Sequence, residues 1–221
     1  MNTQTTAATT TVRKKKLTIQ WMTGTAMMIA LTLVLANTPL GRITMPFLTA
    51  TTLHIPVIIA TLVLGLEAGV LTGLTFGIHS LISNLTGASF FAPFFINPLV
   101  SVLPRVLFPV CMYFIAEGVK KLTAGFDKHH IIAYVSASAL GTALHTTMVM
   151  GMIYLLNAGK IEQMLTAGMG VPDAIASRGV GMGIAAMGVT NGLPEAIVAA
   201  VIAPIVALAL DRAIGRIQIR K

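Results

Sequence analysis

The chain has 221 residues and a formal net charge of +8, and 55% of its residues are hydrophobic while only 10% are charged. A soluble domain normally carries about 25% charged residues, so this composition excludes a water-soluble globular protein and indicates an integral membrane protein. The apolar runs are continuous and do not alternate with polar residues, which favours membrane helices over barrel strands.

The basic residues lie mainly in short clusters beside the apolar runs. These clusters contain Arg13, Lys14, Lys15, Lys16, Lys120, Lys121, Lys128, Arg212, Arg216, Arg220 and Lys221. This is the positive-inside pattern, which places basic loops in the cytoplasm and argues against a nucleic-acid partner. The single cysteine, Cys111, excludes an intrachain disulfide or a thiolate metal site. No phosphate-binding loop, zinc-protease motif or serine-hydrolase motif occurs, so we predict no cofactor, and any ATP hydrolysis falls to a partner.

We predict a disordered cytoplasmic tail at residues 1–16, a six-helix membrane domain at 17–212 and a basic C-terminal tail at 213–221. The first span is residues 17–36, because about 20 uncharged apolar residues cross a bilayer. An alternative is a cleaved signal peptide, with "RKKK" as its basic region and "VLA" as its cleavage site.

Residues 54–83 form one apolar run that is too long for a single span. As one helix it would measure about 45 Å, against a hydrocarbon core of about 30 Å. It would also place Glu67 near the middle of the bilayer, which is costly without a partner. We therefore predict a break at "GLEAG", with Glu67 at the water interface. The first helix, residues 55–66, is short and crosses only if "TATTLH" dips inward as irregular backbone.

Three further helices are predicted at residues 98–119, 131–156 and 180–210. The aromatic loop at 84–97 either anchors at the interface or covers a pocket. An even number of spans, six, places both termini on the same side of the membrane. If that side is the cytoplasm, eleven of the fifteen Lys and Arg residues lie on the cytoplasmic side, as the positive-inside pattern requires. The predicted fold is therefore an all-α membrane protein with six spans and both termini cytoplasmic.

Ionisable residues inside spans are expensive and often functional, and four of them stand out here. They are His79, Arg105, His145 and Glu195. One interpretation is an outward-opening pocket in which the planar guanidinium of Arg105 holds a carboxylate. The alternative is an ion pair between Arg105 and Glu195, although their expected depths of about 10 and 20 Å require long side chains or tilt. The histidines have an alternative structural role, as hydrogen-bonded interior groups.

Two smaller patterns accompany these residues. Asn191 and Glu195 stand one turn apart on the same face of the last helix. Ala26 and Ala30 stand one turn apart on the first helix, where small residues allow another helix to approach closely.

Six short helices and the Ala26-x-x-x-Ala30 pair together resemble the substrate-binding S component of energy-coupling factor (ECF) vitamin transporters. The segment "LHIPVIIATLVLGLEAGVLTGLTFGIHSLISN" is similar to a signature of one branch of this family. "LPRVLFPV" and "NGLPEAIVAAVIAPIV" resemble the fourth and sixth helices of that branch, and the similarity covers most of residues 20–212. Ala60 replaces a glycine of the signature, and Glu67 stands at a position where the branch commonly has a different turn.

The resemblance implies a multi-pass protein of the bacterial plasma membrane that captures a vitamin from outside and is not an enzyme. It also implies docking through Ala26 and Ala30 onto a membrane scaffold (T) subunit that is coupled to two cytoplasmic ATPase subunits. The branch includes members for pantothenate, hydroxymethylpyrimidine, pyridoxine-type compounds and folate, and this chain looks closest to the pantothenate members.

For pantothenate, we expect Arg105 to hold the carboxylate and Glu195 to orient Asn191 or Arg105. The expected hydrogen-bonding residues are Asn97, His145, Thr146 and Asn191, and the residues expected to line the pocket are His54, Asn84 and His79. Three alternatives remain open: a small membrane enzyme with His145 and Glu195 as acid and base, a structural membrane protein, and a free-standing facilitator.

Overall fold

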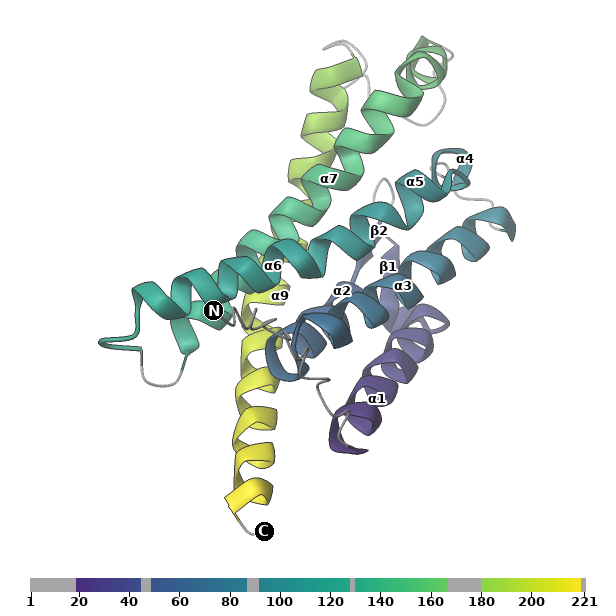
Figure 1. The fold of residues 1–221 in the computed structure, drawn as a ribbon. Coiled ribbons are helices and arrows are strands. Elements are labelled where there is room, and N and C mark those ends of the chain that lie inside the picture. Colours follow the sequence, from purple (N-terminus) through teal and green to yellow (C-terminus); the bar gives the residue numbers. More distant parts are fainter. Residues whose placement is uncertain (1–18, 45–48, 87–91, 128–129, 167–179, 220–221) are drawn as a thin grey trace, which may run out of the picture.

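A computed structural model describes residues 19–44, 49–86, 92–127, 130–166 and 180–219. The predicted N-terminal tail, residues 1–16, lies outside the described residues. The described chain is a bundle of crossing helices, with a two-stranded hairpin near its middle (Figure 1).

The long helices follow the predicted spans closely. In chain order the helices are α1 (Ile19–Ala36), α2 (His54–Ile59), the π-helix η2 (Ala60–Leu64), α3 (Leu66–Thr86), α4 (Ala92–Phe95), α5 (Pro98–Ser101), α6 (Leu103–Leu122), α7 (Ile131–Thr166) and α9 (Val180–Ile219). A 3-10 turn, η1 (Pro39–Gly41), follows α1. The predicted end of the fifth helix at 156 coincides with a kink in α7 at Asn157, and α9 runs beyond the predicted end of the sixth helix.

Among the described residues, five helical segments are long and apolar enough to cross a membrane. They are Ile19–Ala36, Leu66–Thr86, Pro98–Leu122, Ile131–Asn157 and Gly188–Ala213. The predicted second span corresponds to a short apolar helix, His54–Leu64, whose length is about 16 Å at 1.5 Å per residue. A sixth crossing and cytoplasmic termini therefore stay predictions.

The predicted break at "GLEAG" is confirmed. Gly65 has a φ of +97°, a backbone conformation that favours glycine because it has no Cβ, and it separates η2 from α3. Glu67 follows in the first turn of α3 and is exposed. The two helices can therefore turn back on each other without burying the carboxylate.

The segment before α2 is more regular than predicted. Strand β2 (Thr49–Thr51) pairs antiparallel with β1 (Arg42–Thr44), with Arg42 opposite Thr51. The expectation of irregular backbone at "TATTLH" is therefore wrong for residues 49–51. Pairing satisfies backbone groups that would otherwise need a partner near the membrane interior.

Helix α3 packs closely against α6 through three glycines spaced four residues apart, Gly69, Gly73 and Gly77. A Cβ at position 73 would collide with the carbonyl oxygen of Arg105, and one at position 77 would lie 2.9 Å from Val102 Cα. This stripe of small residues brings the two helices together as in other membrane bundles. It also fixes the backbone position of Arg105.

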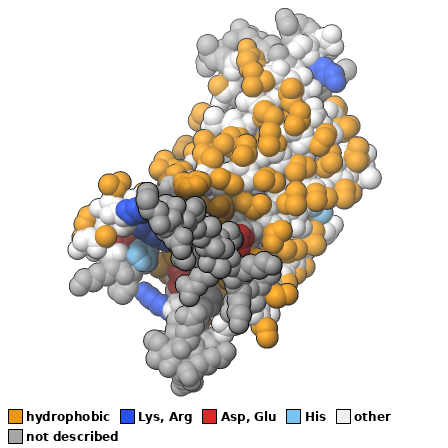
Figure 2. Space-filling model, viewed as in Figure 1, with side chains coloured by type: hydrophobic (Ala, Val, Ile, Leu, Met, Phe, Trp, Pro, Cys, Tyr) orange, Lys and Arg blue, Asp and Glu red, His pale blue; other side chains and the backbone are white. Residues whose placement is uncertain are grey.

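The outer surface is apolar. Hydrophobic side chains cover most of the described face in Figure 2, and few Lys or Arg side chains interrupt it. Phe114 on α6, Leu155 on α7 and Ile205 on α9 are each more than half exposed. Large exposed apolar surfaces are rare in soluble monomers, so this surface fits a lipid environment.

Candidate functional site

Four elements bring polar side chains together in the interior of the bundle. His54 begins α2, Arg105 lies in the first turn of α6, His145 lies midway along α7, and Glu195 lies on α9. His54, Arg105 and His145 are 1%, 6% and 5% exposed, which is unusual for residues of these types. We call His54, Arg105, His145 and Glu195 the histidine–arginine cluster.

The two histidine rings stack on each other, and two phenylalanines contact His145 at tilted angles. The His54 and His145 ring centroids lie 6.4 Å apart with a stacked orientation. Phe108 and Phe76 flank His145, with centroid distances of 5.2 and 6.2 Å. The site therefore has an aromatic wall contributed by α3 and α6.

The guanidinium of Arg105 lies over two aromatic faces. Its Cζ atom is 5.4 Å from the Phe76 centroid and 5.1 Å from the Phe95 centroid. The negative faces of aromatic rings attract a cation, so these rings stabilise the buried charge. Nη1 donates a hydrogen bond of 2.6 Å to the carbonyl oxygen of Val100, which orients the side chain.

Several buried nitrogens of the cluster have no hydrogen-bond partner within the described protein. They are Nε of Arg105 and both ring nitrogens of His54 and of His145. The His54 ring lies beside the backbone of Thr51 and Glu195 without a hydrogen bond of normal geometry to either. An unmade hydrogen bond in a buried position costs about 1–3 kcal/mol. Neutral imidazole both donates and accepts, so the cluster offers matched partners to a polar ligand.

Glu195 contacts the hairpin. Its Oε1 accepts hydrogen bonds from the backbone N of Thr51, at 2.6 Å, and from Thr51 Oγ1, at 3.2 Å. Strand β2 is thereby held against α9, next to the start of α2. The carboxylate thus joins the hairpin to the histidine–arginine cluster.

The ion pair considered between Arg105 and Glu195 is not formed. The two charges attract each other at a distance, but the salt bridge found among the described residues is Lys120–Glu117. The interpretation of Arg105 as one half of a brace is therefore wrong.

The remaining predicted site residues are less central. Asn97 caps α5, where its Oδ1 accepts a hydrogen bond of 3.0 Å from Leu99 N. Asn84 donates to the carbonyl oxygen of Ser80 within α3, at 2.7 Å. Each local bond uses one atom of its amide, and the roles of Asn97 and Asn84 in ligand binding stay predictions.

Thr146, His79 and Asn191 complete the set of predicted residues. Thr146 is half-buried and fills the space beside Gly192 of α9. His79 is half-buried on α3. The side chain of Asn191 lies outside the described residues. Their roles stay predictions.

The sequence analysis missed Phe76, Phe108 and Thr51. Phe108 follows Arg105 by three residues and Phe76 precedes His79 by three, so helical spacing places each beside an ionisable residue already under consideration. Thr51 had no such signal, because its partner Glu195 is 144 residues away.

A family model described as "ECF transporter, substrate-specific component" matches residues 20–207. The chain belongs to this family. An ECF substrate-specific component is a membrane protein and the substrate-binding subunit of a transporter, and it is not an enzyme. It takes a small-molecule substrate and works with the partners of an ECF module. No curated protein was found to match the chain.

Proposed function

We propose that this S component captures a carboxylate-bearing vitamin, with pantothenate as the first choice, and binds it at the histidine–arginine cluster. The observation that carries the proposal is the buried Arg105, whose guanidinium forms no salt bridge and whose Nε forms no hydrogen bond with any residue that the structure describes. A buried cation in a membrane protein is normally paired, so an anionic ligand is the expected partner.

Pantothenate suits the chemistry of the cluster. It carries a carboxylate, an amide and two hydroxyl groups, and it has an apolar middle. Arg105 takes the carboxylate as a charge-assisted pair, and the nitrogens of His54 and His145 serve the hydroxyl and amide groups. Phe76 and Phe108 cover the apolar part. Hydroxymethylpyrimidine and pyridoxine-type compounds lack a carboxylate, and folate needs a larger pocket with aromatic walls.

The aromatic wall beside His145 is the observation that favours a ring-containing vitamin as the second candidate. Phe108 and Phe76 both face that imidazole. A flat heterocycle such as pyridoxine or hydroxymethylpyrimidine gains from stacking on such faces. In that case the charge of Arg105 would contribute little to affinity.

Calorimetric titration of the purified protein with pantothenate, hydroxymethylpyrimidine, pyridoxine and folate separates these candidates. We expect tight binding of pantothenate and its loss in Arg105→Ala. Arg212→Ala is the matched control, because it removes an equal charge from an exposed position on α9. Unchanged pantothenate affinity in Arg105→Ala would remove that residue from the site, and a stronger response to a neutral ring compound would replace pantothenate.

We propose that the bound vitamin is delivered into the cell by the ECF route. The termini face the cytoplasm of a bacterial plasma membrane, and the protein docks onto a membrane scaffold (T) subunit coupled to two cytoplasmic ATPases. Ala26 and Ala30 are both exposed on α1, which leaves their small-residue face accessible to a second helix.

Copurification with the scaffold and both ATPases tests the docking face. Ala26→Trp should abolish copurification, since indole prevents close approach of helices. Met27→Trp, at the next exposed position and on a different face of α1, should retain it. Vitamin uptake in the absence of any partner would instead indicate a free-standing facilitator, and chemical turnover would indicate an enzyme.

A further inference from the structure

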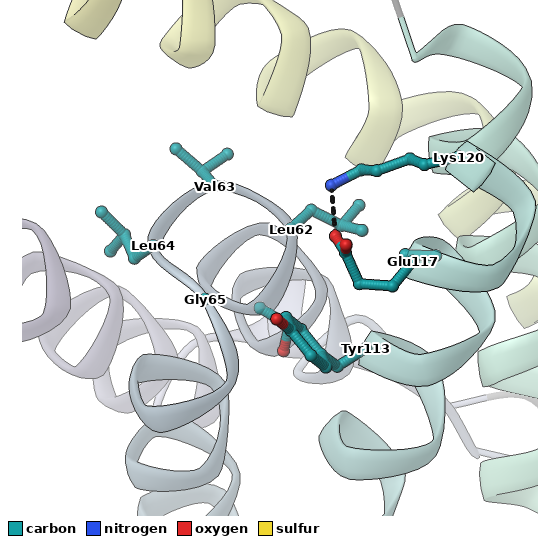
Figure 3. Close-up of a pocket in the computed structure, with 9 residues that line it drawn as sticks. Leu62, Val63, Leu64, Gly65, Tyr113, Glu117 and Lys120 are labelled. Atoms are coloured by element: carbon teal, nitrogen blue, oxygen red, sulfur yellow. Dashed lines mark hydrogen bonds and ion pairs between the residues drawn. The ribbon is translucent and has the colours of Figure 1, made fainter. Parts of the chain in front are cut away.

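A second polar site lies at the opposite end of α6 from Arg105. A pocket of about 220 Å³ is formed between η2 and the C-terminal turns of α6, lined by residues 61–65 and by Tyr113, Glu117 and Lys120. Figure 3 shows Glu117 and Lys120 pointing from α6 toward the turn at Leu62–Gly65. Lys120 is fifteen residues beyond Arg105, a distance of about 22 Å along the helix, so this pocket is separate from the histidine–arginine cluster.

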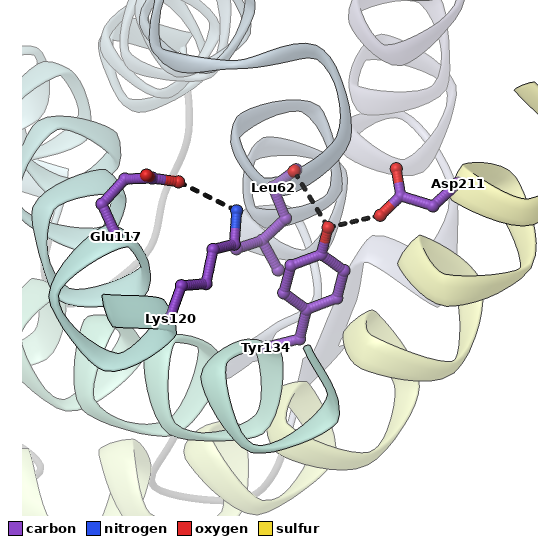
Figure 4. A network of polar contacts seen from close by, with 5 residues as sticks. All are labelled: Leu62, Glu117, Lys120, Tyr134 and Asp211. Carbon is purple, nitrogen blue, oxygen red and sulfur yellow. Dashed lines mark hydrogen bonds and ion pairs between the residues drawn. The ribbon is translucent and has the colours of Figure 1, made fainter. Parts of the chain in front are cut away.

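Hydrogen bonds hold the turn that lines the pocket. The hydroxyl of Tyr134 on α7 lies between Asp211 of α9 and the carbonyl oxygen of Leu62, at 3.4 Å from the latter, and shares its single proton between them (Figure 4). Trp21 of α1 donates to the carbonyl oxygen of Leu64 at 3.0 Å. A π-helix leaves carbonyls free for such bonds, and π-helical segments frequently occur at functional sites. The lining turn is therefore bonded to two neighbouring helices, α1 and α7.

The pocket lies where charged residues end two candidate membrane spans. Lys120 and Lys121 occupy the last turn of α6, and the span Gly188–Ala213 of α9 ends with Asp211 and the exposed Arg212. Lys120 Nζ also lies 5.4 Å from the centroid of the Tyr134 ring. Charged residues at span ends mark the level of lipid headgroups. Pockets between membrane helices at this level can hold such headgroups.

The volume favours a ligand that enters only in part. Sites that enclose a whole small molecule measure about 300–1,000 Å³, so a pocket of about 220 Å³ is below that range. Phe114 directly follows the lining residue Tyr113 on α6 and is 64% exposed. A polar headgroup in the pocket with an acyl chain along this apolar flank of α6 would satisfy both surfaces.

The charges select the headgroup. Lys120 and Glu117 form an ion pair of 2.9 Å whose side chains are 23% and 38% exposed. Exposed pairs of this kind contribute little to stability, so a ligand can separate them at low cost. A headgroup with one anion and one cation would form two ion pairs, one with Lys120 and one with Glu117, in place of the single pair between these residues.

We propose that this pocket binds the headgroup of phosphatidylethanolamine, with its phosphate on Lys120 and its primary ammonium on Glu117. A primary ammonium donates hydrogen bonds to a carboxylate, whereas the quaternary ammonium of phosphatidylcholine cannot. Phosphatidylglycerol offers the phosphate but no cation for Glu117. The site therefore ranks the three lipids by headgroup alone.

Native mass spectrometry of the full chain, with these three lipids carrying identical acyl chains, tests the proposal. We expect about threefold to fivefold more retained phosphatidylethanolamine than phosphatidylcholine, the difference made by one hydrogen bond. Glu117→Gln should remove this preference. Lys120→Met should lower the retention of both phosphatidylethanolamine and phosphatidylcholine. Lys121→Met is the matched control, because Lys121 is exposed and does not line the pocket, and it should behave as the unmodified protein.

Equal retention of the three lipids, or a preference for phosphatidylglycerol, would overturn the proposal. A preference for phosphatidylethanolamine that persists in Glu117→Gln would overturn it as well. Water-soluble phosphoethanolamine is the last arm. If it displaces the lipid at comparable concentration, the pocket serves a soluble ligand and the lipid assignment is wrong. The melting temperature of each variant, measured in the same detergent, confirms that the compared proteins are folded.

Discussion

Two polar clusters are built from the same four parts of the chain and differ in how their hydrogen bonds are satisfied. The α2–η2 helix, α6, α7 and α9 supply His54, Arg105, His145 and Glu195 to one cluster and Leu62, Lys120, Tyr134 and Asp211 to the other. In the Tyr134 cluster the hydroxyl, the carboxylate and the ammonium all have partners. In the histidine–arginine cluster five buried nitrogens have none among the described residues.

This difference in hydrogen bonding assigns a structural role to the Tyr134 hydrogen bonds and a vitamin-binding role to the histidine–arginine cluster. A satisfied buried network strengthens the fold, whereas an unsatisfied one lowers stability until a ligand completes it. A ligand at 100 times its dissociation constant then adds about 2.7 kcal/mol to the free energy of unfolding. Changes in the histidine–arginine cluster should therefore act on vitamin affinity, and loss of the Tyr134 hydrogen bonds should act on stability.

Arg105→Ala should produce the largest effect on binding. Loss of a charge-assisted pair with a carboxylate costs about 3 kcal/mol, which lowers affinity roughly 100-fold. The unfolding free energy of the ligand-free protein should change by less than about 1 kcal/mol, because the variant also removes a buried, unpaired cation. Calorimetry and chemical denaturation in one detergent measure the two quantities. A large loss of stability with unchanged affinity would reverse the assignment of roles.

Gly73→Ala should affect both affinity and stability. The added Cβ collides with the carbonyl oxygen of Arg105, so α3 and α6 must separate and the guanidinium must move. Overpacking of this kind costs about 1–3 kcal/mol. Gly118→Ala on α6 is the control, since its Cβ meets no atom within 4 Å. If Gly73→Ala unfolds with the midpoint of the control, close contact between these helices does not position the site.

Tyr134→Phe should affect stability alone. It removes the hydrogen bonds to Asp211 and to the carbonyl oxygen of Leu62 while preserving the ring beneath Lys120. Hydrogen bonds between membrane helices contribute about 0.6 kcal/mol on average and about 1.7 kcal/mol at most, so we expect a loss near 1 kcal/mol. Vitamin affinity should stay within about threefold of the unmodified protein. A tenfold loss of affinity would show that the two clusters are coupled.

The sequence predicted what depends on length and on polarity within an apolar run. The break at Gly65 followed from the excess length of residues 54–83 and the cost of burying Glu67. Arg105 and His145 stood out because ionisable residues are rare within spans. These arguments use one segment at a time, and the structure brings both residues into one cluster.

The contacts between segments were beyond such reasoning. Tyr134 and Asp211 are 77 residues apart, and their pairing depends on how α7 and α9 are rotated. Helices that are apolar on every face give no amphipathic signal from which rotation can be inferred. The glycine stripe on α3 was visible in the sequence as a repeat of four residues, but only the structure shows α6 as its partner.

Thr51→Val should give the smallest effect and tests how the hairpin is joined to the site. The variant removes the hydroxyl bond of 3.2 Å to Glu195 and keeps the stronger backbone bond of 2.6 Å to the same oxygen. A single hydrogen bond to a charged group at a partly exposed position contributes about 0.5–1.5 kcal/mol, so we expect vitamin to dissociate about threefold faster. Glu195→Gln weakens both bonds and should accelerate dissociation of the vitamin further.

The hairpin can act on the ligand because β2 lies shortly before α2, which begins with His54. A hairpin released from α9 exposes His54 to water, and stopped-flow displacement would detect this as faster release of the vitamin. Identical dissociation rates in all three proteins would mean that the hairpin does not retain the ligand, and the contact between Thr51 and Glu195 would then join the Tyr134 cluster as a purely structural one.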